Sequence, residues 1–242
     1  MFAELNSILN VSPEHFSRGE FALLTDRQSD ASFLIHHFLG FYLRAGCQVC
    51  FVGLAQSLSH YSAVSQRLGV SLSQAKEKGQ LVFLEGLNES LSILNPHDAR
   101  KGSEAMDFLR NPSAGLQSLV QFVSASFSHA RSAVEGANDG HGPPVLLVDD
   151  GNVVMLLRCD GEDDVESDDG SERLLRGLTH QCSLALHVRS LPTGYCRDIH
   201  GQVEVFDRRT QAGSQQKKKT FQYKVHDRGA SFFAPGTSSA VL

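Results

Sequence analysis

The sequence lacks several features that would assign it to a class of protein at once. No stretch reaches the ~18 apolar residues that a membrane-spanning helix needs. The N-terminus, MFAELNSILN, has neither the basic start nor the apolar run of a secretory signal. A net charge of −5 argues against binding nucleic acid through an overwhelmingly basic surface. We therefore expect an intracellular protein, in the cytoplasm with the nucleus as the alternative, that does not enter a membrane.

Cysteine is scarce, and the five cysteines form an odd set that fits a reducing compartment better than a disulfide framework. Cys47 and Cys50 have the C-x-x-C spacing found in redox sites and in half of some zinc sites. However, the surrounding CQVCFVGLA is the entry to a strand, and no second C-x-x-C or paired histidines at metal spacing accompany it. The sequence therefore predicts ordinary buried cysteines and no metal site.

A third absence lies in residues 21–46, which read as a buried strand, a polar turn and an amphipathic helix. In many nucleotide-binding proteins such a turn has the spacing G-x-x-x-x-G-K-[ST], whose backbone N–H groups and lysine hold phosphates. On that template Thr25 and Asp30 stand at the glycine positions and Ala31 at the lysine position, and only Ser32 fits. The turn from Thr25 to Ser32 therefore lies where a phosphate loop would lie but lacks the glycines and the lysine that hold phosphates.

The same turn offers a helix cap and an alternative function. Asp30 or Ser32 is expected to accept a hydrogen bond from an unpaired N–H at the start of the helix. An active ATPase with an unorthodox phosphate loop is the alternative, in which Arg27 would compensate for the charges of Asp26 and Asp30.

The predicted elements alternate strand and helix, which is typical of a single doubly wound α/β domain over residues 1–242 with a mostly parallel sheet flanked by helices. Late strands added antiparallel are a familiar extension of such a sheet. The predicted strands are residues 21–24, 47–54, 81–84, 145–150, 153–157, 182–188, 203–208, 220–225 and a short one at 232–233; the predicted helices are 33–45, 59–68, 71–78, 116–134 and 172–178.

The run VLLVDD at residues 145–150 resembles the second signature of phosphate-loop proteins, in which an aspartate at a strand end holds Mg²⁺. A turn or capping aspartate is the commoner meaning, and the missing lysine favours it for Asp149. The next strand follows after only Asp150, Gly151 and Asn152, too few residues for a crossover between parallel neighbours. Either the two strands form an antiparallel hairpin, which Asp-Gly favours, or a crossover helix is missing.

Three segments flank this framework: an N-terminal extension at 1–19, an acidic flexible loop at 158–171 and a basic loop at 208–219. Residues 160–169, DGEDDVESDD, repel one another and offer almost nothing apolar to anchor them. The basic loop reads either as a solvated hairpin tip or as an arm that reaches nucleic-acid phosphates. Its candidate contacts are Arg208, Arg209, Lys217, Lys218 and Lys219.

Long segments spread over nearly the whole chain resemble one family. They are MFAELNSILN, FLIHHFLGFYLRAGCQVCFVGLAQSLSHYSAVSQRLGVSL, QLVFLEGL, VLLVDD, LTHQ, TGYCRDIHGQ and ASFFAPGTSSAVL. Together they resemble the Elongator complex protein 6 family. The resemblance implies a RecA-like ATPase fold that has lost its nucleotide site, and therefore a protein with no cofactor and no catalytic residue.

The resemblance also implies partners. Family members assemble with Elongator proteins 4 and 5 into a heterohexameric ring, which binds tRNA and the catalytic part of Elongator and supports modification of the wobble uridine, U34. Thr25, Asp30 and Ala31 then match a degenerate phosphate loop, and Asp149 a degenerate magnesium position. Ala55 and Gln56 lie where a catalytic relative has its water-activating glutamate, and neither can act as a general base.

One departure from the family lies after Asp150. Family members carry more chain there, including a helix, before the strand that matches residues 151–157, so this sequence looks shortened. Loss of a crossover helix would uncover one face of the sheet, and at about 25 cal/mol per Å² the lost burial would amount to several kcal/mol.

Overall fold

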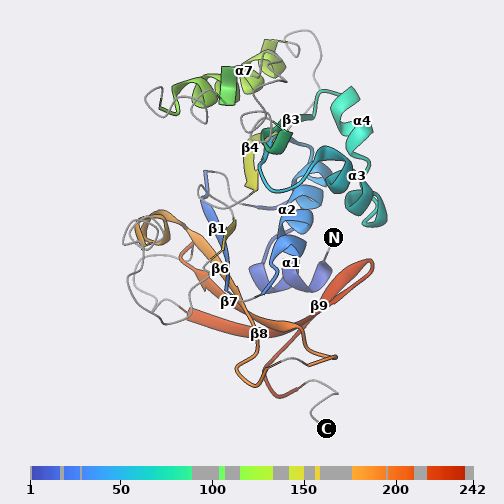
Figure 1. Ribbon diagram of the computed structural model, residues 1–242, viewed down its shortest axis with the longest axis vertical. Helices are drawn as coiled ribbons and strands as arrows, with labels where there is room; N and C mark the ends of the chain where they lie inside the picture. The colour runs from blue at the N-terminus through green and yellow to red at the C-terminus, as the bar shows by residue number, and fades with distance from the viewer. Residues whose placement is uncertain are drawn as a thin grey trace, which may run out of the picture. The chain divides into compact units, whose positions relative to one another are not determined.

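The computed structural model describes residues 2–16, 19–27, 29–88, 104–106, 115–132, 142–149, 156–158, 176–194, 196–209 and 217–237. The chain divides into two compact units, Met1–Phe38 with Asp150–Leu242, and Leu39–Asp149. We describe each unit by itself, and the single domain over 1–242 stays a prediction. Figure 1 traces the elements in chain order by colour.

The first unit is built on a six-stranded sheet with the order β5-β1-β6-β7-β8-β9. Strands β5 and β6 pair with β1 in parallel, and β7, β8 and β9 follow as an antiparallel meander. The strands are β1 (Ala22–Arg27), β5 (Leu156–Arg158), β6 (Leu184–Arg189), β7 (Gly201–Asp207), β8 (Lys217–His226) and β9 (Gly229–Phe233). This arrangement confirms the predicted late hairpin and the short last strand.

One side of this sheet, which we call the apolar face, is covered by helices. Because side chains alternate along a strand, the register places one buried set there: Leu24, Leu186, Val188, Val203, Val205 and Tyr223. Helix α1 (Ala3–Leu9) and the first residues, 32–38, of α2 (Ser32–Arg44) supply the cover. The ring of Phe33 stacks on Tyr223 at 4.8 Å between centroids, and Phe2 lies 6.5 Å from Phe232. The N-terminal segment therefore covers the chain's own sheet.

The second unit holds a three-stranded parallel sheet with the order β3-β2-β4. Every residue of the central strand is buried, which confirms the prediction of a strand covered on both faces, and Cys47 and Cys50 are buried free thiols, as predicted. Its strands are β2 (Cys47–Gly53), β3 (Leu81–Glu85) and β4 (Gly142–Asp149). Its helices are α3 (Leu58–Arg67), α4 (Leu72–Glu77), the 3-10 turn η1 (Glu104–Met106) and α7 (Gln117–Ser132).

The two sheets together confirm the predicted α/β class, with four parallel and three antiparallel pairings in the described part of the chain. Glycines end the predicted helices as expected, since Gly46 and Gly69 have φ of 73° and 76°. None of the helices in the ranges given above is long and apolar enough to cross a membrane.

The predicted hairpin after Asp149 is wrong. Strand β4 pairs in parallel with β2, and β5 pairs in parallel with β1, so the two strands lie in different sheets. Residues 150–155 between them lie outside the described residues and are too few for a crossover within one sheet. The sequence left two alternatives, an antiparallel hairpin or a missing crossover helix. The observed strand pairing agrees only with the missing crossover. The acidic run at 160–169 also lies outside the described residues.

Candidate functional site at the start of helix α2

The turn that we predicted to begin at Thr25 begins later. Strand β1 runs through Arg27 and α2 begins at Ser32, so only residues 28–31 connect them. Thr25 lies inside the strand, where it pairs with Leu157 on β5 and His187 on β6. A buried, β-branched threonine suits a strand. The residue at the first glycine position of the template therefore lies in a strand. The connection between β1 and α2 is too short for a phosphate loop.

The first N–H groups of α2 are hydrogen-bonded by the chain's own carboxylates. The N–H of Ser32 donates to Asp30 Oδ1 at 2.8 Å, and the N–H of Ala31 donates to Asp26 Oδ2 at 3.4 Å. Ala31 and Asp26 are 0% and 1% exposed. The start of a helix attracts anions, because its N–H groups and dipole both favour negative charge. Here side-chain carboxylates occupy the place that a phosphate takes in a nucleotide site, and of the two predicted caps, Asp30 is the one used.

Tyr223 of β8 lies against the same turn. Its hydroxyl is hydrogen-bonded to Ser29 Oγ at 2.8 Å. Burial raises the pKa of the Tyr223 phenol, and the negative charges of Asp30 and Asp26 raise it further. The turn is thus closed by a neutral phenol and carries negative charge, which would repel a phosphate.

The second half of the expected nucleotide site belongs to the second unit. Asp149 ends β4 and is buried, and its carbonyl accepts a hydrogen bond from Leu54 N–H at 3.0 Å. Ala55 and Gln56 follow β2, where we expected them. In the described residues no group of three or more histidine, cysteine or acidic side chains could hold a metal ion. The role of the Asp149 side chain stays a prediction.

Arg208 and Arg209, predicted as basic loop residues, are engaged within the fold. Arg209 is 13% exposed and donates to Asp207 at 2.7 and 2.9 Å and to the carbonyl of Leu9 at 2.7 Å. Its hydrogen bond holds the pKa of the Asp207 carboxyl below the usual range, although burial opposes the shift. Arg208 donates to the carbonyls of Thr179 and Cys182, at the end of the helical segment 176–181. These arginines fix α1 and that segment to β7.

The three lysines of the predicted basic loop belong to strand β8, so the loop ends earlier than predicted, while its start after Asp207 is as predicted. Lys218 Nζ lies 2.9 Å from Glu204 Oε1 and 5.6 Å from the centroid of the Phe206 ring. Lys219 is exposed, and the backbone of Lys217 pairs with Asp207. Residues 210–216 lie outside the described residues.

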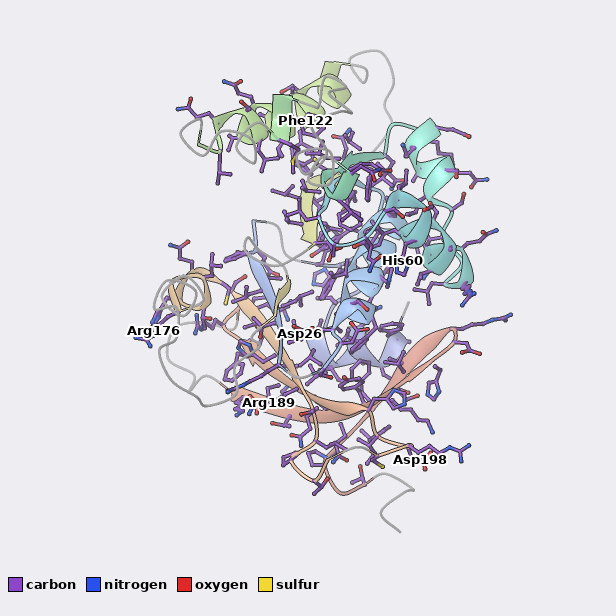
Figure 2. The ribbon with its side chains drawn as sticks, in the orientation of Figure 1. Asp26, His60, Phe122, Arg176, Arg189 and Asp198 are labelled. Carbon is purple, nitrogen blue, oxygen red and sulfur yellow. The ribbon has the colours of Figure 1, made fainter. Side chains whose placement is uncertain are left out.

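The sheet side opposite the apolar face carries a polar cluster that sequence reasoning missed. We call it the polar face: Thr25, Arg27, His187, Arg189, Glu204 and Lys218. Arg189, labelled in Figure 2, ends β6, and Asp26, also labelled, lies on the neighbouring strand β1. Polar residues inside the apolar strands LALHVR and GQVEVFD are the only sequence signal, and their partners are far away in the chain.

The centre of the polar face is a row set by the strand register. Thr25 Oγ1 and His187 Nδ1 share a hydrogen bond across 162 residues of sequence. Burial lowers the pKa of His187, while the nearby charge of Glu204 works against that shift and Arg189, Lys218 and Arg208 add to it. Glu204 is nearly buried. One of its oxygens accepts a hydrogen bond from Arg189, and the other forms an ion pair with Lys218. The row is therefore an ionic network centred on Glu204.

Comparison with known families gives this geometry a context. A family model described as Elongation complex protein 6 matches residues 2–150 and 150–227, most of the chain. The chain belongs to the Elongator complex protein 6 family. The resemblance inferred from its segments is thereby confirmed.

Curated relatives in this family match over their full lengths. The Elongator complex protein 6 of Danio rerio is 53% identical over 272 positions, that of Homo sapiens 42% over 278, and that of Xenopus laevis 39% over 275, each covering 100% of both chains. These alignments are longer than the 242 residues of this chain, so the relatives have residues that this chain lacks. The family match itself breaks at residue 150, the position where the sequence predicts missing chain.

Two solved structures from Pyrococcus horikoshii are similar at a more distant level. An uncharacterised protein in complex with an unknown peptide has 12% identity and a TM-score of 0.45, over 96% of this chain and 97% of its own. A KaiC-like protein has 10% identity and a TM-score of 0.43, over 90% and 91%.

Proposed function

We propose that this member of the Elongator complex protein 6 family is a non-catalytic, RecA-like subunit of Elongator. It assembles with Elongator proteins 4 and 5 into a heterohexameric ring. The ring binds tRNA and the catalytic part of Elongator and so supports modification of the wobble uridine. Its location is the cytoplasm, with the nucleus as the alternative. Family membership supports the Elongator context, and the start of α2 supports the non-catalytic role.

The single observation that carries the non-catalytic role is the pair of carboxylates at the start of α2. To bind there, a nucleotide phosphate would have to displace Asp26, which is buried, and Asp30 from the N–H groups that they accept from. It would also meet two like charges with no lysine nearby in the sequence to neutralise them. The function therefore lies in the surfaces of this chain and not in phosphate chemistry.

Calorimetry of the full chain with Mg-ATP tests the non-catalytic role. We expect no measurable heat of binding, because the N–H groups at the start of α2 already have acceptors. Binding with a submillimolar dissociation constant, abolished by Arg27→Gln, would contradict the proposal.

That outcome would favour the second candidate, a RecA-like ATPase with an unorthodox phosphate loop. One observation supports it: Arg27 and Arg189 lie opposite each other at the carboxyl ends of the parallel strands β1 and β6. Ligands of α/β sheets bind at such strand ends.

Co-expression with Elongator proteins 4 and 5, followed by native mass measurement, tests the ring. We expect a heterohexamer that contains this chain. Recovery of Elongator proteins 4 and 5 without this chain would overturn the assembly, while leaving the nucleotide result unaffected.

A further inference from the structure

We propose that the polar face binds the phosphate backbone of RNA, with Arg189 and Lys218 as the phosphate contacts and Arg27 beside them. The inference rests on the proposed function, because it gives the tRNA of the assembled ring a surface on this chain. Of the contacts predicted from sequence it keeps Lys218 and leaves out Arg208 and Arg209, which are held inside the fold.

The first observation is that Glu204 holds the cations of Arg189 and Lys218 at the surface. Arg189 donates a hydrogen bond to Oε2 and Lys218 forms an ion pair with Oε1 of this one carboxylate, from strands on either side of β7. The side chain of Glu204 is only 8% exposed, whereas those of Arg189 and Lys218 are 48% and 49% exposed. The negative charge therefore lies below and the positive charges face solvent. A phosphate group that approaches from outside meets two positioned donors.

The second step is the excess of positive charge. The chain as a whole carries a net charge of −5, yet the six described residues of the polar face include three cations, Arg27, Arg189 and Lys218, and one acid, Glu204. Arg27 and Arg189 are direct neighbours across β1 and β6. An anion near this pair would interact favourably with both guanidinium groups.

The third step distinguishes RNA from an acidic protein segment. Protein interfaces have an apolar centre. In the described part of the chain the large hydrophobic side chains that are exposed are Leu116, Val120 and Leu146, all of them in the second unit. The register instead places Gln202 and Thr220 next to the cations of the polar face. Amide and hydroxyl side chains beside cations are typical of contacts to phosphate and sugar.

The test uses the assembly reconstituted with Elongator proteins 4 and 5, titrated with a tRNA transcript between about 50 and 200 mM salt. The variants are Arg189→Gln and Lys218→Gln. Each should weaken binding by about threefold to tenfold at low salt and reduce the salt slope by about one. The matched controls are Arg67→Gln and Lys76→Gln, which remove the same charges from exposed positions on α3 and α4 and should change neither quantity.

A third variant, Glu204→Gln, has the opposite expected sign. It removes the one acid of the polar face with little change in volume, so tRNA should bind about threefold more tightly and with a steeper salt dependence. A variant that merely failed to fold could not bind more tightly. Equal or weaker binding by Glu204→Gln would overturn the electrostatic role of the polar face.

The remaining outcomes separate the two proposals. If the wild-type assembly binds tRNA and the polar-face variants match their controls, the polar face is not the site, and the proposed function stands. If the variants lose the hexamer while the controls keep it, the polar face is a protein interface, and the RNA inference is wrong. If the wild-type hexamer binds no tRNA, the tRNA role in the proposed function fails, and this inference fails with it.

Discussion

The apolar and polar faces are two surfaces of the same six strands, and alternate residues of each strand contribute to each. On the apolar face Leu186 and Val203 are buried, and the burial of their apolar side chains stabilises the fold. On the polar face His187 and Glu204, their immediate neighbours in sequence, make specific hydrogen bonds and ion pairs. Neighbouring residues of one strand therefore have different roles: Leu186 and Val203 contribute burial, while His187 and Glu204 contribute polar and ionic contacts.

The difference between the two faces indicates which side of the six-stranded sheet can carry charged side chains. Helix α1, which covers part of the apolar face, is attached by polar contacts near both its ends: Glu4 accepts from the N–H of Phe232, and Arg209 donates to the carbonyl of Leu9. The six residues of the polar face supply little hydrophobic stabilisation, although the same side of the sheet also carries the buried cluster of Leu23, Cys182 and Ala185. Its cations can then serve recognition, which is the basis of the RNA inference. The predictions below separate the two faces, in order of decreasing effect.

The largest effect should follow from Leu186→Ala on the apolar face. This side chain is 0% exposed, and its truncation leaves a cavity under the helices, so the free energy of unfolding should fall by about 3 kcal/mol. Urea denaturation of the purified chain measures it. The control is Gln202→Ala on the polar face, expected to cost about 0.5 kcal/mol or less. Equal losses would mean that the two faces do not differ in their energetic role.

The next effect concerns the edge of the apolar face at Gly201. A Cβ atom there would lie 2.6 Å from the carbonyl oxygen of Arg189 and 2.9 Å from the hydroxyl of Tyr223. Gly201→Ala should therefore reduce the free energy of unfolding by about 2 kcal/mol. Gly177→Ala is the control, because the new Cβ has open space within a helical segment and should stabilise by up to about 1 kcal/mol. Changes of the same sign would contradict the close packing at Gly201.

A somewhat smaller effect should follow from Arg209→Met, which detaches α1 from β7. The change removes the donors to Asp207 and to the carbonyl of Leu9, and should cost about 1–2 kcal/mol of unfolding free energy. Arg67→Met on α3 is the exposed control, expected within about 0.5 kcal/mol of wild type. In conditions where the Arg209→Met assembly is folded, its tRNA affinity should equal that of wild type. Reduced affinity would return Arg209 to the RNA contacts predicted from sequence.

The smallest effect is a dependence on pH from the polar face. Because burial lowers the pKa of His187, the folded state keeps the ring neutral at pH values where the unfolded chain, with a pKa of about 6.5, takes up a proton. This stabilisation is present above about pH 6.5 and is lost as the pH falls through the lower folded-state pKa. His187→Gln should flatten the decline in unfolding free energy between about pH 7 and pH 5, by up to about 1 kcal/mol. Parallel pH curves for variant and wild type would show that His187 does not titrate in this range.

Much of the fold follows from local pattern. The apolar run at 47–54 became the fully buried strand β2, and the glycines Gly46 and Gly69 ended helices as predicted. The prediction failed where charged residues continue a strand. Asp26 and Arg27 have the composition of a turn, yet they lie in β1, because the Asp26 carboxylate is buried as an acceptor for α2. Lys218 was also predicted to lie in a loop because it is charged, although strand pairing with β7 places it in β8.

The sequence by itself determined the family, the α/β alternation and the lack of a lysine and glycines at the phosphate turn, because each is a property of residues close together in the chain. Only the tertiary structure decided what takes the place of that chemistry. It aims the carboxylates of Asp26 and Asp30 at the first N–H groups of α2, and through strand register it brings Thr25 beside His187 and Glu204. Register depends on how distant strands pair, and composition or periodicity within one strand does not specify its partner.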